Sequence, residues 1–393
     1  MTNRMRAAVL LGNTYFGQRD LPKARAEFAP LIPQGESVLA ANPAAAELRH
    51  WLAEAHVGLG LTHRSVGDNA AYLEQVQLAL ILFDADAPED KRDREWRYLH
   101  ASALSNLGDG LQATPRFEEG LLHMRTAADE LDRLSAEFPE QRLYLRQAML
   151  TWSHIADALA GRNDEAGALD AARKFVEIAR KRQRDDPADE GATGDLGIAL
   201  YRLSERLSEQ AAERSATLEE AISLLRSIVT RNSKNAQIRS FLASADVRIG
   251  EILRSRQPAR AVSHWNEAVS VTEPLLSTGI AAFGNSYLSA TRYLADDAIS
   301  RGNPAAAENL MSKVSAARAG LETTARPSPQ QALLVLNFRS TEALIGARLG
   351  AAGARQAVLE SISGWAQESR RTPLTAAQKK LLAELQSALG RTQ

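Results

Sequence analysis

The stretch WSHIADAL at residues 152–159 contains the pattern that decides the fold. At its centre the apolar residue Ile155 is followed by the small residue Ala156. The same pair of residue types recurs at regular steps of 48 residues, at Leu11-Gly12, Leu59-Gly60, Leu107-Gly108 and Leu203-Ser204. Less regular copies follow at Ile249-Gly250, Leu294-Ala295 and Ile345-Gly346, after steps of 46, 45 and 51 residues. A sustained period of this size is the signature of a repeat array, so we predict eight units rather than several unrelated domains.

Each unit is expected to form two helices joined by a short break. In the first unit the apolar residues lie three or four positions apart within each helix, and the alternating runs typical of strands are missing. An Asp or Asn eight residues after the small position is expected to cap the second helix, at Asp20, Asp68, Asp164 and Asn303. These side chains are therefore interpreted as structural.

Prolines indicate where the helices end, because a proline inside a helix removes a backbone hydrogen bond. Pro43, Pro139 and Pro187 each follow the small residue by 31 positions and are expected to separate units. We expect Pro30, Pro33 and Pro274 to break or end the second helices of their own units. In the fifth unit Ala221 lies 17 residues after Ser204 instead of twelve, which predicts a longer loop at residues 210–216.

These residues resemble tetratricopeptide repeats, whose signature runs W-x2-L-G-x2-Y, followed by Ala, Phe and Pro. The first unit supplies Leu11-Gly12, Tyr15, Ala24 and Phe28, and the fourth supplies Trp152, Ile155-Ala156, Leu159, Ala168 and Pro187. The period of 48 departs from the usual 34 and implies longer helices. Such long units also resemble the arrays attached to bacterial serine/threonine kinases, although the chain has no Gly-rich phosphate loop, no H-R-D and no D-F-G motif.

The predicted fold is all-α: a right-handed α-solenoid of about eight hairpins similar to tetratricopeptide repeats, over residues 1–371, followed by a capping helix over residues 372–393. Stacked hairpins of this kind share one apolar core. The units are expected near 1–43, 44–90, 91–139, 140–187, 188–235, 236–278, 279–326 and 327–371. The cap is predicted from a Thr375/Gln378 capping box that precedes Leu381, Leu382, Leu385 and Leu389 on one face.

Composition removes several classes of function. The 393 residues hold 47 Lys and Arg against 48 Asp and Glu, so the net charge of −1 disfavours binding of nucleic acid by bulk electrostatics. The chain has no Cys, and its densest apolar run, residues 78–83, is far shorter than the ~18 residues that a membrane span needs. With no signal peptide visible, we expect a cytoplasmic protein without membrane insertion, or an extracytoplasmic one if it is part of a larger membrane-anchored protein.

No pattern for a metal, a cofactor or catalysis stands out, and we predict none of the three. His56 and His63 occupy positions where the resemblance places Trp and Tyr, so both are expected to pack between helices. The other histidines lack the spacing of ligands, and Asp84 and Asp86 are expected at an exposed helix end. The cationic run at residues 173–184 closes a helix before Pro187, where cations complement the negative helix end; contact with nucleic acid or an acidic partner is the alternative.

One acid directly follows the small residue in five consecutive units. These acids are Asp109, Asp157, Glu205, Glu251 and Asp296, and the polar Asn13 takes the position in the first unit. The resemblance places this position on the concave groove, so one hypothesis is an acidic groove for a partner with a basic segment. The alternative is that each acid pairs with an Arg of a neighbouring unit or caps a backbone group.

The function expected from these patterns is a non-catalytic protein–protein interaction scaffold that binds a protein or peptide in the concave groove. The alternative is the sensor or docking region of a larger bacterial serine/threonine kinase or signalling regulator, whose catalytic domain lies outside this chain. That alternative is suggested by the first helix, which begins almost at Met1 without a preceding cap.

Overall fold

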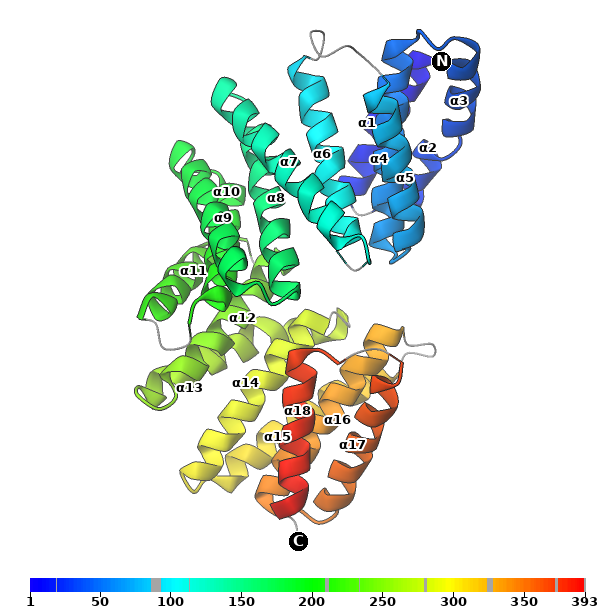
Figure 1. Cartoon of the computed structure of the whole chain (residues 1–393). Coiled ribbons are helices and arrows are strands. Elements are labelled where there is room, and N and C mark those ends of the chain that lie inside the picture. The colour runs from blue at the N-terminus through cyan, green and yellow to red at the C-terminus, as the bar shows by residue number, and fades with distance from the viewer. Residues whose placement is uncertain are drawn as a thin grey trace. The chain divides into compact units, whose positions relative to one another are not determined.

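The computed structural model describes residues 1–18, 20–85, 93–112, 114–208, 212–232, 234–278, 281–323, 328–371 and 374–391. Within these ranges the regular structure is helical and contains no strand (Figure 1). The chain divides into two compact units, Met1–Ala192 and Thr193–Gln393. We call them the N-terminal unit and the C-terminal unit and describe each by itself.

The N-terminal unit is a series of paired helices. Its helices are α1 (Thr2–Gly17), α2 (Leu21–Phe28), α3 (Ile32–Ala41), α4 (Ala46–Ser65), α5 (Asn69–Asp84), α6 (Arg94–Leu111), α7 (Phe117–Glu137), α8 (Arg142–Gly161) and α9 (Glu165–Asp185). Helix α10 (Glu190–Arg206) contains the boundary between the two units. The pairs α4/α5, α6/α7 and α8/α9 make the most extensive contacts, and α5 and α7 also contact the hairpins that follow them.

The C-terminal unit continues the same arrangement. It contains α11 (Ala212–Arg231), α12 (Ala236–Leu253), α13 (Pro258–Thr272), the 3-10 helix η2 (Glu273–Thr278), α14 (Ala281–Ser300), α15 (Pro304–Glu322), α16 (Pro329–Leu349), α17 (Ala354–Ser369) and α18 (Ala376–Arg391). Here the first helices of successive hairpins are α10, α12, α14 and α16, and the second helices are α11, α13, α15 and α17. Neighbouring first helices touch directly, as α12 and α14 do, and α14 and α16.

The predicted caps and breaks are confirmed. Asp20, Asp68, Asp164 and Asn303 each accept a hydrogen bond from the backbone three residues ahead, at the start of α2, α5, α9 and α15. Pro43, Pro139 and Pro187 lie between helices. The second helix of the first hairpin is split into α2 and α3, and α13 gives way to η2 beside Pro274. Local signals read from the sequence therefore set the ends of these helices.

The predicted loop at residues 210–216 needs correction, and some predicted unit boundaries fall on residues that the structure does not describe. The loop predicted at residues 210–216 is wrong over residues 212–216, because α11 already begins at Ala212. Residues 210 and 211 lie outside the described residues, as does Asp86. The predicted unit boundaries at 43/44, 139/140, 187/188 and 235/236 fall between helices; those at 90/91, 278/279, 326/327 and 371/372 involve residues outside the description. The division into eight units stays a prediction.

Apolar side chains link each hairpin to the next. In the N-terminal unit Tyr72 and Val76 of α5 pack with Trp96 and Leu107 of α6, which starts the following hairpin. In the C-terminal unit one cluster runs from α10 to α14 and includes Trp265 of α13. Because each hairpin has apolar faces on both sides, burial of those faces requires its neighbours.

Helix α18 caps the last hairpin as predicted. Thr375 and Gln378 form the expected capping box, with the Thr375 hydroxyl accepting from the Gln378 backbone and the Gln378 side chain accepting from the Thr375 backbone. Leu381 and Leu385 are buried with Trp365 of α17. An adjacent side of α18 also makes contacts: Lys380 lies 3.8 Å from Glu251 of α12, and Glu384 lies 3.2 Å from Arg292 of α14. The cap therefore reaches the first helices of earlier hairpins.

Candidate binding groove

In the C-terminal unit the first helices of successive hairpins line one cavity of about 510 Å³. Helices α10, α12, α14 and α16 each contribute, and the start of α18 closes one side. We call this space the first-helix cavity. Its polar lining consists of Tyr201, Ser244, Arg248, Glu251, Asn285, Ser286, Ser289, Arg292, Tyr293, Asn337, Thr341, Thr375, Gln378 and Lys380.

Hydroxyl and amide side chains connect neighbouring helices along this cavity. The hydroxyls of Ser244 on α12 and Ser286 on α14 lie 3.1 Å apart. On the next step, Nδ2 of Asn337 on α16 donates to Oδ1 of Asn285 on α14 over 3.1 Å. Such groups both donate and accept hydrogen bonds, so they can satisfy the N–H and C=O groups of an extended peptide.

A second cavity of about 460 Å³ adjoins the first and shares Arg248, Glu251, Tyr293 and Lys380 with it. Its further lining includes three arginines, Arg214, Arg254 and Arg256. We call the two cavities together the first-helix groove.

Glu251 lies at the junction of the two cavities. Its carboxylate accepts a hydrogen bond from the Tyr293 hydroxyl, lies 2.8 Å from a guanidinium nitrogen of Arg248 and 3.8 Å from Nζ of Lys380. Burial raises the pKa of Tyr293, and the negative charge of Glu251 raises it further. The Tyr293 hydroxyl is therefore neutral at physiological pH and donates to Glu251.

Two of the five predicted groove acids are held by arginines of neighbouring hairpins. Asp109 on α6 forms an ion pair with Arg64 on α4, and its side chain is only 8% exposed. Asp296 on α14 pairs with Arg348 on α16 and with Arg254, which directly follows α12, over 3.6 Å. For these two acids the contacts match the structural alternative of pairing between units.

The remaining sequence-predicted site residues are distributed differently. Asn13 on α1 and Asp157 on α8 are exposed in the N-terminal unit. Glu205 on α10 is exposed and accepts a hydrogen bond from the Tyr201 hydroxyl over 3.1 Å. Of the six residues, Glu251 alone is among the described residues that line the first-helix groove. A ligand-binding role for the six stays a prediction.

Sequence reasoning missed the arginines of the groove, although a signal for them existed. Arg248 precedes Glu251 by three residues and Arg292 precedes Asp296 by four. Residues three or four apart lie on the same face of a helix. The spacing could therefore have placed cations beside the acids on the first helices.

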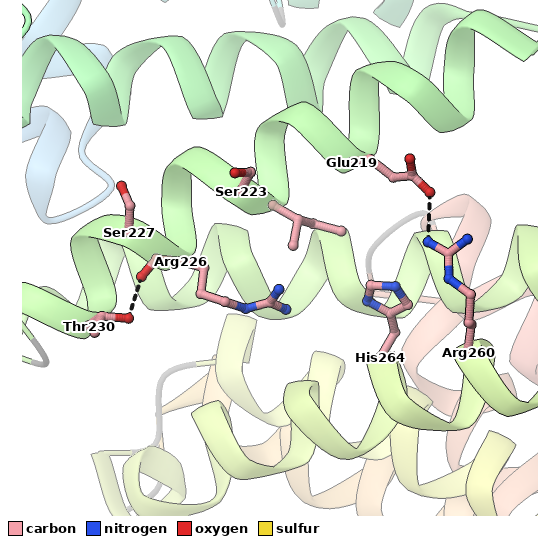
Figure 2. A pocket seen from close by; sticks show the side chains of 8 residues that line it. Glu219, Ser223, Arg226, Ser227, Thr230, Arg260 and His264 are labelled. Atoms are coloured by element: carbon pink, nitrogen blue, oxygen red, sulfur yellow. Dashed lines mark hydrogen bonds and ion pairs between the residues drawn. The ribbon is translucent and has the colours of Figure 1, made fainter.

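The C-terminal unit has another polar cavity, of about 520 Å³, on the second helices α11 and α13 (Figure 2). Its charged side chains are paired with each other or with their neighbours. Arg260 donates to Glu219 over 2.9 Å, and the guanidinium of Arg226 lies 3.3 Å from Asp246. Nδ1 of His264 lies 2.7 Å from Oδ1 of the same Asp246. We interpret this cavity as the outer side of a network that ties three helices together.

The histidines singled out in the sequence pack against neighbouring residues. His56 is buried, and its Nδ1 lies 2.8 Å from Oε1 of Gln75. His63 lies 3.4 Å from the carboxylate of Asp68. Among the described residues, no group of three or more His, Asp or Glu is arranged to hold a metal ion. In the same part of the chain, no helix combines the length and the apolar character that crossing a membrane requires.

No family model matches this chain, and no curated protein matches it. Solved structures do. The apo form of RapI has a TM-score of 0.56 at 9% identity, and the match covers 99% of this chain and 96% of RapI. The apo form of the quorum sensor NprR from B. thuringiensis has a TM-score of 0.48 at 13% identity, covering 97% and 98%. A tetratricopeptide repeat protein from Parabacteroides merdae ATCC 43184 has a TM-score of 0.42 at 13% identity, covering 85% and 98%.

The likeness to RapI at this low identity shows the fold alone. Together with the paired helices and the capped breaks, it confirms the all-α, tetratricopeptide-repeat-like fold predicted from the sequence. The chain is a TPR-like helical repeat protein in its architecture.

Proposed function

We propose that this chain is a non-catalytic scaffold that binds a protein or peptide partner, and that the first-helix groove of the C-terminal unit is a binding site. The observation that carries the proposal is that all four first helices of the unit, α10, α12, α14 and α16, line one polar cavity. A partner in that position would contact several repeats at once.

The chemistry of the lining supports a peptide ligand. Ser286, Asn285, Ser289 and Asn337 offer hydroxyl and amide groups at successive steps along the cavity. An extended chain presents backbone donors and acceptors at short intervals, and these side chains can pair with both kinds. The fold shared with RapI is compatible with such a role, because stacked hairpins present extended binding surfaces.

The test is a selection of random 12-residue peptides against the full chain, followed by binding measurements on cavity-filling variants. Ser289→Trp places a large ring in the first-helix cavity. Ser223→Trp does the same in the cavity of Figure 2 on the second helices and serves as the matched control. We expect the selected peptides to lose affinity for Ser289→Trp and to keep it for Ser223→Trp. The reverse pattern, measured on variants with unchanged circular dichroism and thermal unfolding, contradicts the proposed site.

Two finer expectations remain predictions within this proposal. The first is that the acids that follow the small residue of each repeat contact a basic segment of the partner. Asp157 on α8 is an exposed example of these acids. The sensor or docking region of a bacterial serine/threonine kinase or signalling regulator is the alternative context. In that context the same groove would bind the regulatory partner.

A further inference from the structure

The first-helix groove is rich in cations, although the whole chain is almost neutral. Its lining contains Arg214, Arg248, Arg254, Arg256, Arg292 and Lys380, whereas Glu251 is the one acidic residue among the described lining residues. Stacking of the hairpins gathers these cations from α11, from α12 and the turn that follows it, and from α14 and α18.

Acids just outside the groove neutralise only part of this charge. Asp296 is shared between Arg254 and Arg348, and Glu384 pairs with Arg292. Glu205 acts on Arg248 electrostatically. With Arg214 left aside, the described lining cations Arg248, Arg254, Arg256, Arg292 and Lys380 face four acids, namely Glu205, Glu251, Asp296 and Glu384, and Asp296 is also shared with Arg348. This set of residues therefore keeps an excess of positive charge. Arg256 is exposed and makes no side-chain hydrogen bond or ion pair with the described residues.

Tyr293 holds two of the guanidinium groups in place. The guanidinium carbons of Arg254 and Arg292 lie 5.7 and 5.6 Å from the centre of its ring. The ring itself is stacked on buried Trp265, with centroids 5.0 Å apart. Arginines that are positioned before binding lose less conformational entropy when they pair with a ligand, so these side chains are suited to fixed contacts with carboxylates.

We infer that the first-helix groove binds an acidic peptide segment of a partner protein, whose carboxylates pair with Arg254, Arg256 and Lys380 while its backbone meets the amide and hydroxyl side chains. This inference rests on the proposed function and specifies the chemistry of its partner. Single-stranded nucleic acid fits less well, because it requires aromatic faces on which bases can stack. Tyr293 is covered by Trp265 and the two arginines, and Tyr201 packs against Phe241.

Fluorescence anisotropy of labelled 12-residue probes tests the inference on the full chain. The probes are three repeats of Asp-Ser-Glu-Gly, the neutral counterpart with Asn and Gln, the basic counterpart with Lys and Arg, and a 12-nucleotide single-stranded DNA. We expect the acidic peptide to bind at least tenfold more tightly than the other three, with affinity that falls as salt is raised.

Two arginines four positions apart provide matched charge reversals. Arg256→Glu changes a cation of the groove, whereas Arg260→Glu changes an exposed cation that lines the cavity of Figure 2. Arg256→Glu should lower the affinity for the acidic peptide roughly tenfold. Arg260→Glu should leave that affinity within about twofold of the wild type. Equal losses in both variants, tighter binding of the basic peptide or the DNA, or no binding of the acidic probe overturns the inference. If selected peptides are blocked by Ser289→Trp regardless of their charge, the proposed function stands and only the inference about charge fails.

Discussion

His264 of α13 and Asp246 of α12 form a partly buried link between two helices of the C-terminal unit: Nδ1 of the histidine lies 2.7 Å from Oδ1 of the aspartate. The Asp246 side chain is 0% exposed, and Arg226 of α11 approaches it from a third helix. In the repeat, Asp246 takes the position that Trp152 has in the fourth unit. A fully buried acid thus stands where the fourth unit has a partly buried aromatic ring, and cations accompany it.

The first prediction concerns the pH dependence of stability at Asp246. Burial raises the pKa of this carboxyl above its ordinary value of 3.8, and the bond from His264 and the charge of Arg226 only partly oppose the rise, while Glu267 adds to it. The folded protein therefore holds the proton more tightly than the unfolded chain, so this contribution to stability is present at low pH and is lost as pH rises through the raised pKa.

Asp246→Asn has no proton to release. The free energy of unfolding of this variant, relative to the wild type, should therefore increase between pH 4 and pH 7, as measured by urea unfolding. Asp246→Leu should follow the same trend from a different starting value. A difference that does not change with pH in either variant would show that the carboxyl is not destabilised by burial.

His56 gives the second prediction, with the opposite dependence. Burial lowers the pKa of this imidazole below its ordinary 6.5, despite the bond to Gln75 and the nearby Glu36. Between pH 7 and pH 5 the unfolded chain takes up a proton first, so the wild type loses stability as pH falls. His56→Leu and His56→Gln should both lack this loss, which urea unfolding at the two pH values measures. If the free energy of unfolding changes equally with pH in the wild type and in both variants, the prediction for His56 is contradicted.

The third prediction concerns the close contact between α6 and α7. A Cβ atom on Gly108 would overlap the carbonyl oxygen of Gly120 and the side chain of Met124. Because a backbone carbonyl cannot move aside as a flexible side chain can, Gly108→Ala should lower the free energy of unfolding by about 1–3 kcal/mol. Gly161→Ala, at a position with no atom within 4 Å of the added Cβ, is the control and should be neutral or raise stability by up to ~1 kcal/mol. Similar losses in both would exclude steric overlap as the cause.

The fourth prediction separates the structural role of an acid from a binding role. Asp109→Asn removes the charge that pairs α6 with Arg64 of α4. We expect a loss of about 2 kcal/mol in chemical unfolding, because Arg64 is left beside a mostly buried neutral group. Glu205→Gln, at an exposed acid in the equivalent repeat position, should stay within about 0.5 kcal/mol. Unchanged stability of Asp109→Asn together with weaker peptide binding would favour the acidic-groove hypothesis for this residue.

Much of the fold could be predicted because its signals are local. The period of 48 residues locates the hairpins, and Asp68 or Asp164 can cap a helix with a backbone group only three residues away. Proline acts on its own helix, as Pro274 does where α13 ends. The start of α11 was missed, because the residue count predicts that extra residues are present but does not show whether they join a helix or a loop.

The candidate site depends on contacts that the linear pattern does not contain. The sequence by itself determined the helical hairpins, their caps and the regular placement of acids such as Glu251 and Asp296. Only the tertiary structure decided the partners of those acids and gathered Arg254, Arg292 and Lys380 around one groove. The physical reason is that the sign of a local field depends on every charge within a few ångströms. Stacked helices bring together residues that lie about 40 to 130 positions apart, as with Tyr293 or Lys380 beside Glu251.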